Sequence, residues 1–148
     1  MLQMEYIRNI LGTMTLMSGA DTEKVSVNLG MVDLGQVDLL VEQGFYSNRT
    51  DFIRTAVRNQ IQQHSSVVQE QLSSRVMGLG VVSYDRKALE RLLDRGKMLE
   101  LRMVGVVHLS SDVTPELALA TISAVKVFGA FRASAAVKKA LIARTEVW

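Results

Sequence analysis

The sequence contains no cysteine, which excludes disulfide bonds, thiol catalysis and cysteine metal sites, and which fits a reducing compartment. Histidine is scarce as well: His64 and His108 are the two imidazoles, and they are far apart in the chain. No stretch approaches the roughly 20 apolar residues that a membrane-spanning helix requires. Because these ligands and segments are missing, we predict no metal ion and no membrane partner.

Neither sign of charge predominates in the chain. The net charge is +2, distributed as −1 over residues 1–22, −1 over residues 23–65 and +4 over residues 66–148. Any interaction with nucleic acid must therefore depend on where particular side chains point. Apolar residues are plentiful at 48%, so the chain can build the core of one ordinary domain or of two small ones.

Residues 1–22 are predicted to be an N-terminal extension. Glu5 and Arg8 interrupt its apolar residues, and the basic start and cleavage site of a signal peptide are missing. The extension is either a short docking helix or a disordered tail, since several of its apolar residues can share one helical face. These are Ile7, Ile10, Leu11, Met14 and Met17.

Residues 23–29 alternate strictly between polar and apolar side chains, which predicts a half-buried β-strand that ends at Gly30. The apolar side comprises Val25, Val27 and Leu29, and the polar side comprises Lys24, Ser26 and Asn28.

Two helices are predicted to follow this strand. Asp33 is the expected N-cap of the first, and Gly44 is the expected left-handed residue after its end. Ser47 or Asn48 is expected to cap the second helix, with Asp51 in its first turn. The apolar faces comprise Leu34, Val37, Leu40 and Val41 in the first helix, and Phe52, Ile53, Ala56, Val57 and Ile61 in the second.

A lone strand leaves both of its edges unpaired and is not stable by itself. The simplest remedy is a second copy of the chain, whose strand pairs antiparallel across a two-fold axis. The helices of both copies then cover the apolar side of the ribbon, and the polar side faces outward. A two-stranded ribbon of this kind fits the major groove of B-DNA.

The segment resembles the ribbon-helix-helix superfamily (CopG, Arc, MetJ and relatives) in the strand KVSVNL, in the turn GFYSNRTDFIR and in their spacing. The resemblance implies an obligate homodimer that binds double-stranded DNA. It further implies that outward strand residues read base edges and that the start of the second helix holds a phosphate. Carried over residue by residue, the base readers are Lys24, Ser26 and Asn28, and the phosphate clamp is Ser47, Asn48 and Arg49.

Other interpretations of these residues stay open. The polar strand side could simply be solvated, and Arg49 could be a surface residue or the ion-pair partner of Asp51. We expect Arg54 and Arg58 to face solvent or the other subunit. Helix N-termini do attract anions, and lysine and asparagine can pair with purine acceptors in the major groove.

The second half contains a repeat of about 24 residues anchored on Gly80, Gly105 and Gly129. Each unit is predicted to be a short strand, a glycine kink, a capped turn and a short helix, with helices near 85–95, 114–122 and 134–144. Consecutive units of this kind favour a parallel sheet or a short solenoid whose ends need caps. The expected caps of the turns are Asp85, Ser110 and Ser134, and those of the sheet ends are Val67, Val68, Leu72, Val147 and Trp148.

The predicted fold is therefore α+β, with a ribbon-helix-helix unit and a three-unit βα repeat. The predicted parts are an extension at 1–22, the ribbon-helix-helix domain at 23–65, a linker or helix extension at 66–75, and a βα-repeat oligomerisation domain at 76–148. In the repeats, the lone His108 and the absence of cysteine argue against a metal-sensing domain. The GLG at 78–80 lacks a phosphate-loop pattern, and no nucleophile–base constellation appears, so we predict no cofactor and no enzyme activity.

The expected function is a cytoplasmic, nucleoid-associated regulator, most plausibly a CopG-type transcriptional repressor, whose repeats drive association beyond the dimer. An antitoxin with a toxin partner is a disfavoured alternative, because its C-terminal segment is usually short and disordered before binding. A self-assembling scaffold anchored on DNA is another alternative, and no residue cluster points to a small-molecule effector.

Overall fold

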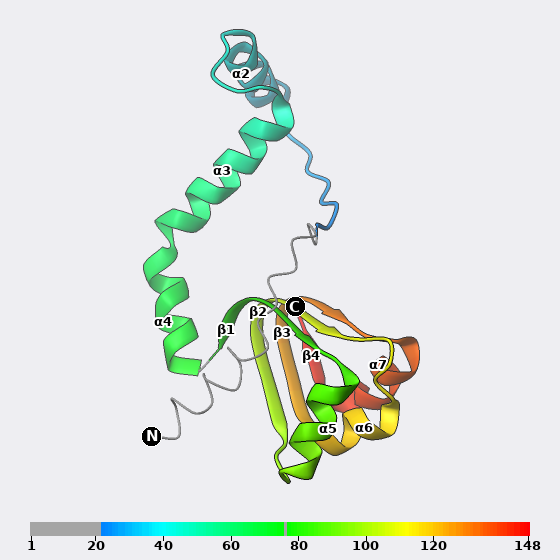
Figure 1. The fold of residues 1–148 in the computed structure, drawn as a ribbon. Coiled ribbons are helices and arrows are strands. Elements are labelled where there is room, and N and C mark those ends of the chain that lie inside the picture. Colours follow the sequence, from blue (N-terminus) through cyan, green and yellow to red (C-terminus); the bar gives the residue numbers. More distant parts are fainter. Residues whose placement is uncertain (1–21, 76) are drawn as a thin grey trace. The chain divides into compact units, whose positions relative to one another are not determined.

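The computed structural model describes residues 22–75 and 77–148, which fall into two compact units (Figure 1). One unit is Thr22–Ser74, and the other contains Arg75–Trp148. The described residues combine six α-helices with a four-stranded parallel sheet, so the predicted mixture of helix and strand is confirmed. The predicted extension, apart from Thr22, lies outside the described residues.

The Thr22–Ser74 unit contains α2 (Met31–Glu42), α3 (Arg49–Gln63) and nearly all of α4 (Ser65–Arg75). Both helices predicted in this region are present. The backbone leaves helical geometry at His64, with φ −100° and ψ 14°, so α3 and α4 are separate helices. Residues 66–75, predicted as a linker or a helix extension, therefore form most of an independent helix.

The start of α2 differs from the prediction. Its N-cap is Gly30, which offers no side-chain hydrogen bond, and Asp33 lies in the first turn of the helix. The expectation that Asp33 caps the helix is therefore wrong, because the helix starts before its first regularly spaced apolar residue, with the exposed Met31 and Val32. A carboxylate in the first turn still interacts favourably with the helix dipole.

The end of α2 agrees with the prediction. Gly44 has a φ of 81°, in the region that favours glycine. Its N–H donates to the Val41 carbonyl at 3.0 Å, and the Phe45 N–H donates to the Leu40 carbonyl at 3.0 Å. This pair of hydrogen bonds is a Schellman motif, which satisfies two carbonyls that the helix itself leaves free.

The second unit contains a parallel sheet whose strand order follows the sequence. Its strands are β1 (Gly78–Tyr84), β2 (Leu99–Leu109), β3 (Ile122–Arg132) and β4 (Thr145–Val147). The connections carry α5 (Arg86–Asp94), α6 (Pro115–Thr121) and α7 (Ala135–Leu141), with the 3-10 turn η1 (Ile142–Arg144) before β4. The three helices lie side by side (Figure 1).

The three anchor glycines are direct neighbours across β1, β2 and β3. Gly80, Gly105 and Gly129 have φ values of 128°, 131° and 133°. A Cβ added to Gly105 would lie 2.0 Å from the Gly80 carbonyl oxygen, and one added to Gly129 would lie 2.2 Å from that of Gly105. Glycine is therefore required at both positions by backbone conformation and by the close approach of the preceding strand.

The helix caps agree with the predicted turns in two units of three. Asp85 accepts a hydrogen bond from the Ala88 N–H at 2.7 Å, and Ser134 accepts one from the Val137 N–H at 3.3 Å. In the middle unit the cap is Thr114, so the expected cap at Ser110 is wrong. There the turn after β2 is longer, and α6 continues directly into β3 at Ile122.

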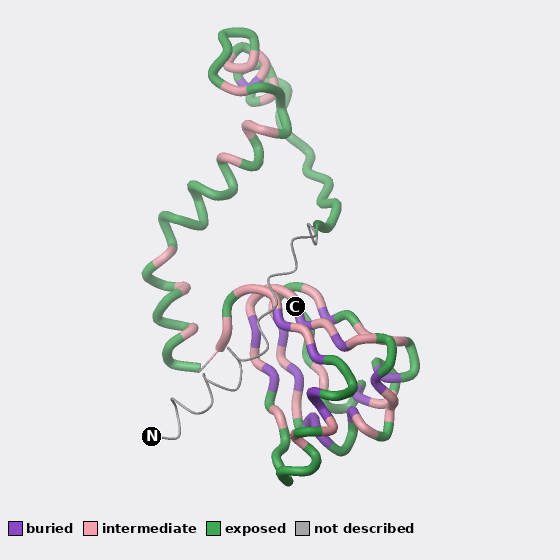
Figure 2. Tube along the Cα trace, in the orientation of Figure 1, coloured by how far each residue is buried: buried purple, intermediate pink, exposed green. Residues whose placement is uncertain are grey.

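One face of the sheet carries the core. Alternate strand residues pack with the helices, and sixteen apolar residues of this unit form one buried cluster. Figure 2 shows this concentration of buried positions along the strands and helices of the second unit. The cluster comprises Val82, Tyr84, Ala88, Leu89, Leu101, Met103, Val107, Leu109, Val113, Ala118, Ile122, Val125, Val127, Phe131, Val137 and Leu141.

Candidate nucleic-acid interface

Residues 22–30 belong to neither a helix nor a strand, and every one of them is exposed. The apolar side of the predicted strand is included: Val25 is 78% exposed, Val27 62% and Leu29 41%. A strand needs a hydrogen-bonded neighbour, and no described part of the chain provides one for this segment. The intermolecular ribbon stays a prediction, and the single chain leaves this segment available for it.

The remainder of this unit is equally open. Among its described apolar side chains Val37 alone is buried, at 4% exposure. Phe52 is half-buried, while the α3 residues Ile53, Val57 and Ile61 are 38%, 53% and 59% exposed. The predicted apolar face of the second helix therefore lacks cover within the described residues, as expected of a unit whose core is completed by another molecule.

The start of α3 brings the predicted phosphate-clamp residues together. Asn48 is the N-cap, and its side-chain oxygen accepts a hydrogen bond from the Asp51 N–H at 2.9 Å. In return, the Asp51 carboxylate accepts a hydrogen bond from the Ser47 N–H at 3.1 Å. This reciprocal pair is a variant of the capping box, in which the Asp51 carboxylate reaches the N–H of the residue before the N-cap. Tyr46 packs edge-on against Phe52, with ring centroids 5.0 Å apart, and fixes the chain on entry to the helix.

Arg49 is engaged within the chain. Its Nε and Nη2 atoms donate to the two carboxylate oxygens of Asp38, each at 2.6 Å, so that a two-pronged ion pair joins α3 to α2. The Arg49 guanidinium holds the pKa of Asp38 below its usual range, chiefly through the hydrogen bond, and Asp38 raises the pKa of Arg49. The ion-pair partner is therefore Asp38, and the considered alternative of Asp51 is wrong.

Sequence reasoning missed Asp38 altogether. Asp38 belongs to α2 and Arg49 to α3, so only the turn between the two helices brings the side chains together. The remaining predicted residues fall into two groups. Lys24, Ser26 and Asn28 are exposed on the extended segment, and Arg54 and Arg58 are exposed on α3.

The second unit offers two polar features. In the first, His108 of β2 forms a hydrogen bond with Ser83 of β1, with 3.1 Å between His108 Nδ1 and Ser83 Oγ.

In the described part of the chain, no three histidine, aspartate or glutamate side chains come together as a metal site would require. None of the described helices is both long and apolar enough to cross a membrane.

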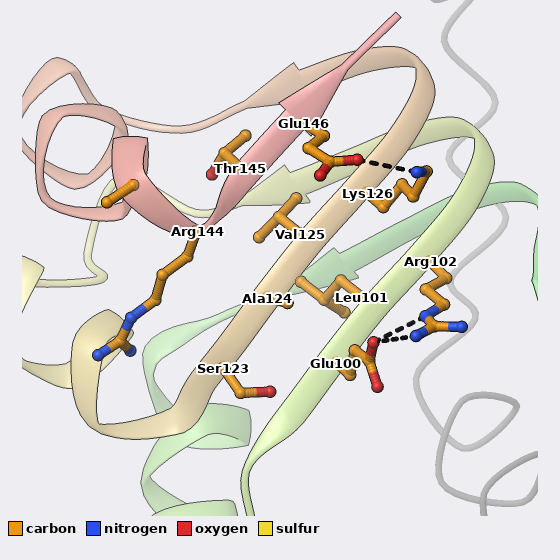
Figure 3. Close-up of a pocket in the computed structure, with 11 residues that line it drawn as sticks. Glu100, Leu101, Arg102, Ser123, Ala124, Val125, Lys126, Arg144, Thr145 and Glu146 are labelled. Carbon is orange, nitrogen blue, oxygen red and sulfur yellow. Dashed lines mark hydrogen bonds and ion pairs between the residues drawn. The ribbon is translucent and has the colours of Figure 1, made fainter.

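A hollow of about 430 Å³ lies at the start of β2 and β3, beside β4 (Figure 3). Four of its charged groups form ion pairs: Arg102 pairs with Glu100, and Lys126 pairs with Glu146 at 2.8 Å. Arg144 instead donates to the carbonyls of Leu119 and Ile122. Lys126 holds the pKa of Glu146 below its usual range, mainly through this hydrogen bond. Parallel sheets bind ligands at the carboxyl ends of their strands, whereas this hollow is at the amino ends.

We compared the chain with known proteins and protein families. No curated protein and no solved structure matches the chain. The model of the Ribbon-Helix-Helix transcriptional regulator family matches residues 20–138, which include the exposed segment, α2, α3, α4 and most of the sheet unit. A single family model thus spans both units and most of the chain. The chain belongs to the Ribbon-Helix-Helix transcriptional regulator family.

Proposed function

We propose that this protein binds double-stranded DNA as a homodimer and represses transcription. The ribbon that enters the major groove is formed by residues 23–29 of two copies. The observation that carries the proposal is the exposed apolar side of this segment, on Val25, Val27 and Leu29. Membership of the family supports the same conclusion.

The energetics favour a partner for this unit. Fully burying a valine or leucine side chain contributes about 1.5–3 kcal/mol. Two copies would bury six such side chains in the ribbon alone, together with the exposed apolar face of α3. Because Val37 is the one buried apolar residue among those described in the unit, a core shared with a second copy has to supply most of its stability.

On this ribbon, Lys24, Ser26 and Asn28 from each copy would face the bases. Lysine can donate to guanine acceptors, asparagine can pair with adenine through two hydrogen bonds, and serine can serve either base. All three side chains are exposed in the single chain, so none of the described residues covers them.

The phosphate contact would come from the start of α3, where the backbone N–H groups of Arg49 and Thr50 have no carbonyl to donate to within the helix. Asn48 would hold this turn in place through its cap. Arg49 would contribute from its ion pair with Asp38, which orients the guanidinium and also neutralises part of its charge. We therefore propose weaker phosphate attraction at this position than a free arginine would give.

We further propose that the second unit mediates self-association. Its core of sixteen buried apolar residues is complete within one chain, whereas an antitoxin tail orders only on its toxin. The same unit also carries the basic excess of the chain, and most of that charge lies on exposed residues.

The test is selection of binding sites from a random pool of duplex DNA with the purified full chain. We expect enrichment of a palindromic or repeated site, and binding that weakens steeply with salt. Lys24→Ala and Asn28→Ala should relax the preference at particular base pairs. Lys87→Ala, which removes an exposed positive charge from α5, is the matched control and should retain the preference of the parent. Failure of the parent to select any sequence, or retention of its full preference by both ribbon variants, would refute the proposal.

A further inference from the structure

The two edges of the sheet differ in their protection. β1 presents seven residues, GLGVVSY, with no charged residue and no proline. Natural proteins usually protect an edge strand with charge, proline, a short length or a cover, because its free N–H and C=O groups can recruit another strand. In the described residues no strand pairs with the outer edge of β1.

The opposite edge of the sheet is the short strand β4. β4 has three residues, among them the charged Glu146. Beyond it the Trp148 N–H donates to the Val127 carbonyl at 3.0 Å, and the Trp148 carbonyl accepts from the Gly129 N–H at 3.2 Å. The Trp148 ring stacks on Phe128, with centroids 6.1 Å apart. Trp148 thus continues the pairing of β4 along β3.

Gly80, Gly105 and Gly129 lie side by side across β1, β2 and β3, and this glycine column is open on the outer side of β1. The Cβ positions of Gly105 and Gly129 are each filled by the carbonyl of the preceding strand, whereas no atom of the described residues lies within 4 Å of a Cβ placed on Gly80. Gly80 nevertheless has the same backbone conformation, with φ 128°. The outer edge of β1 therefore has the shape with which β2 and β3 receive a neighbouring strand.

The side chains of β1 that point away from the helices are largely apolar. Leu79 is 60% exposed, and Val81 is half-buried. In the sheet register Val81 is aligned with Val106 of β2 and Ala130 of β3. An added strand would extend this row and cover Leu79.

We propose that β1 pairs antiparallel with β1 of a second copy, so that two four-stranded sheets join into one sheet of eight strands. A second copy is the fitting partner, because an uncharged strand faces no like-charge repulsion when it pairs with itself about a two-fold axis. Pairing of β1 with β4 of another copy fits less well, because β4 includes the charged Glu146. The inference rests on the proposed self-association of this unit and is independent of the proposed DNA contacts.

Disulfide trapping in the full chain tests the pairing, since the protein has no cysteine of its own. Leu79→Cys, Val81→Cys and Ser83→Cys place one thiol each on the same side of β1. Residues opposite each other in an antiparallel pair have Cβ atoms about 4.5–5.5 Å apart, close to the distance that a disulfide spans. Ala130→Cys, in the same row but on β3, is the matched control.

Under mild oxidation we expect covalent dimers from at least one β1 variant, or from a mixture of two of them, and none from Ala130→Cys. Equal cross-linking of Ala130→Cys would place the association on the sheet face, so that self-association would stand and the edge pairing would fail. The absence of cross-linking from all four variants would overturn the edge pairing. Site selection from random DNA, measured separately, reports on the proposed DNA contacts.

A charge swap provides a second measurement. Val81→Lys and Val81→Glu each put two like charges next to each other in the joined sheet, so amide hydrogen exchange in β1 should accelerate about tenfold or more in each homodimer. Co-expression of the two variants should restore protection, because lysine then faces glutamate. Ala130→Lys should leave exchange in β1 unchanged. If the mixed sample exchanges as fast as either variant alone, the pairing is refuted.

Discussion

Val27 lies in the middle of the apolar side of residues 23–29, where its replacement by alanine tests the ribbon directly. The side chain is 62% exposed in the single chain, and in the proposed dimer it would be buried against the helices of both copies. Valine to alanine removes two carbon atoms, each worth about 0.8 kcal/mol on full burial. Scaled by the fraction still exposed and counted for two copies, Val27→Ala should destabilise the ribbon by about 2 kcal/mol.

That loss corresponds to a change of about 30-fold in the equilibrium between paired and open ribbon, because 1.4 kcal/mol is tenfold. Native-state hydrogen exchange of the backbone amides at residues 24–29 measures this equilibrium locally. The readout holds even if the second units keep the two chains together. Ser26→Ala, on the polar side of the same segment, is the control and should leave exchange unchanged.

Two results would refute the reasoning. In one, the amides of residues 24–29 exchange at unprotected rates in the parent protein at concentrations where it is dimeric, so that there is no ribbon to weaken. In the other, Ser26→Ala accelerates exchange as much as Val27→Ala, so that the two sides of the segment are not different in burial.

Three further predictions concern the folded units. Gly105→Ala should lower the free energy of unfolding by more than the strain of a positive φ alone, which is about 1–3 kcal/mol, because the new Cβ also meets the Gly80 carbonyl. A loss of about 1 kcal/mol or less in urea titrations would contradict the close approach of β1 to Gly105. Asn48→Ala should cost about 1 kcal/mol through the lost cap, and Ser47→Ala, whose backbone alone donates, should cost little by the same titration. The ion pair with Arg49 lowers the pKa of Asp38 in the folded state, so the contribution of Asp38 to stability is present at neutral pH and is lost as the pH falls below about 3.8. In an NMR titration, Arg49→Gln should return the pKa of Asp38 toward its ordinary value. An unchanged titration would show that the ion pair does not form in solution.

Much of the local structure follows from neighbouring residues in the sequence. The alternation at residues 23–29 predicts a strand that the single chain does not form, so this strand stays a prediction. The glycine after α2 and the caps at Asp85 and Ser134 are signals that extend over a few residues. Each depends on backbone geometry that the local side chains impose. The resemblance of residues 23–65 to the ribbon-helix-helix family, carried by the same short patterns, is confirmed by the family model.

Other features were decided by the tertiary structure, because they join residues that no local pattern connects. The Arg49–Asp38 ion pair depends on the angle of the turn between α2 and α3, and so changes the expected role of Arg49. The middle cap is Thr114 because the turn after β2 is longer than the other two. The sheet register aligns Gly80, Gly105 and Gly129 across neighbouring strands and leaves one side of this column open. Register and close approach between strands are properties of the folded sheet, and the spacing of residues along a sequence does not determine them.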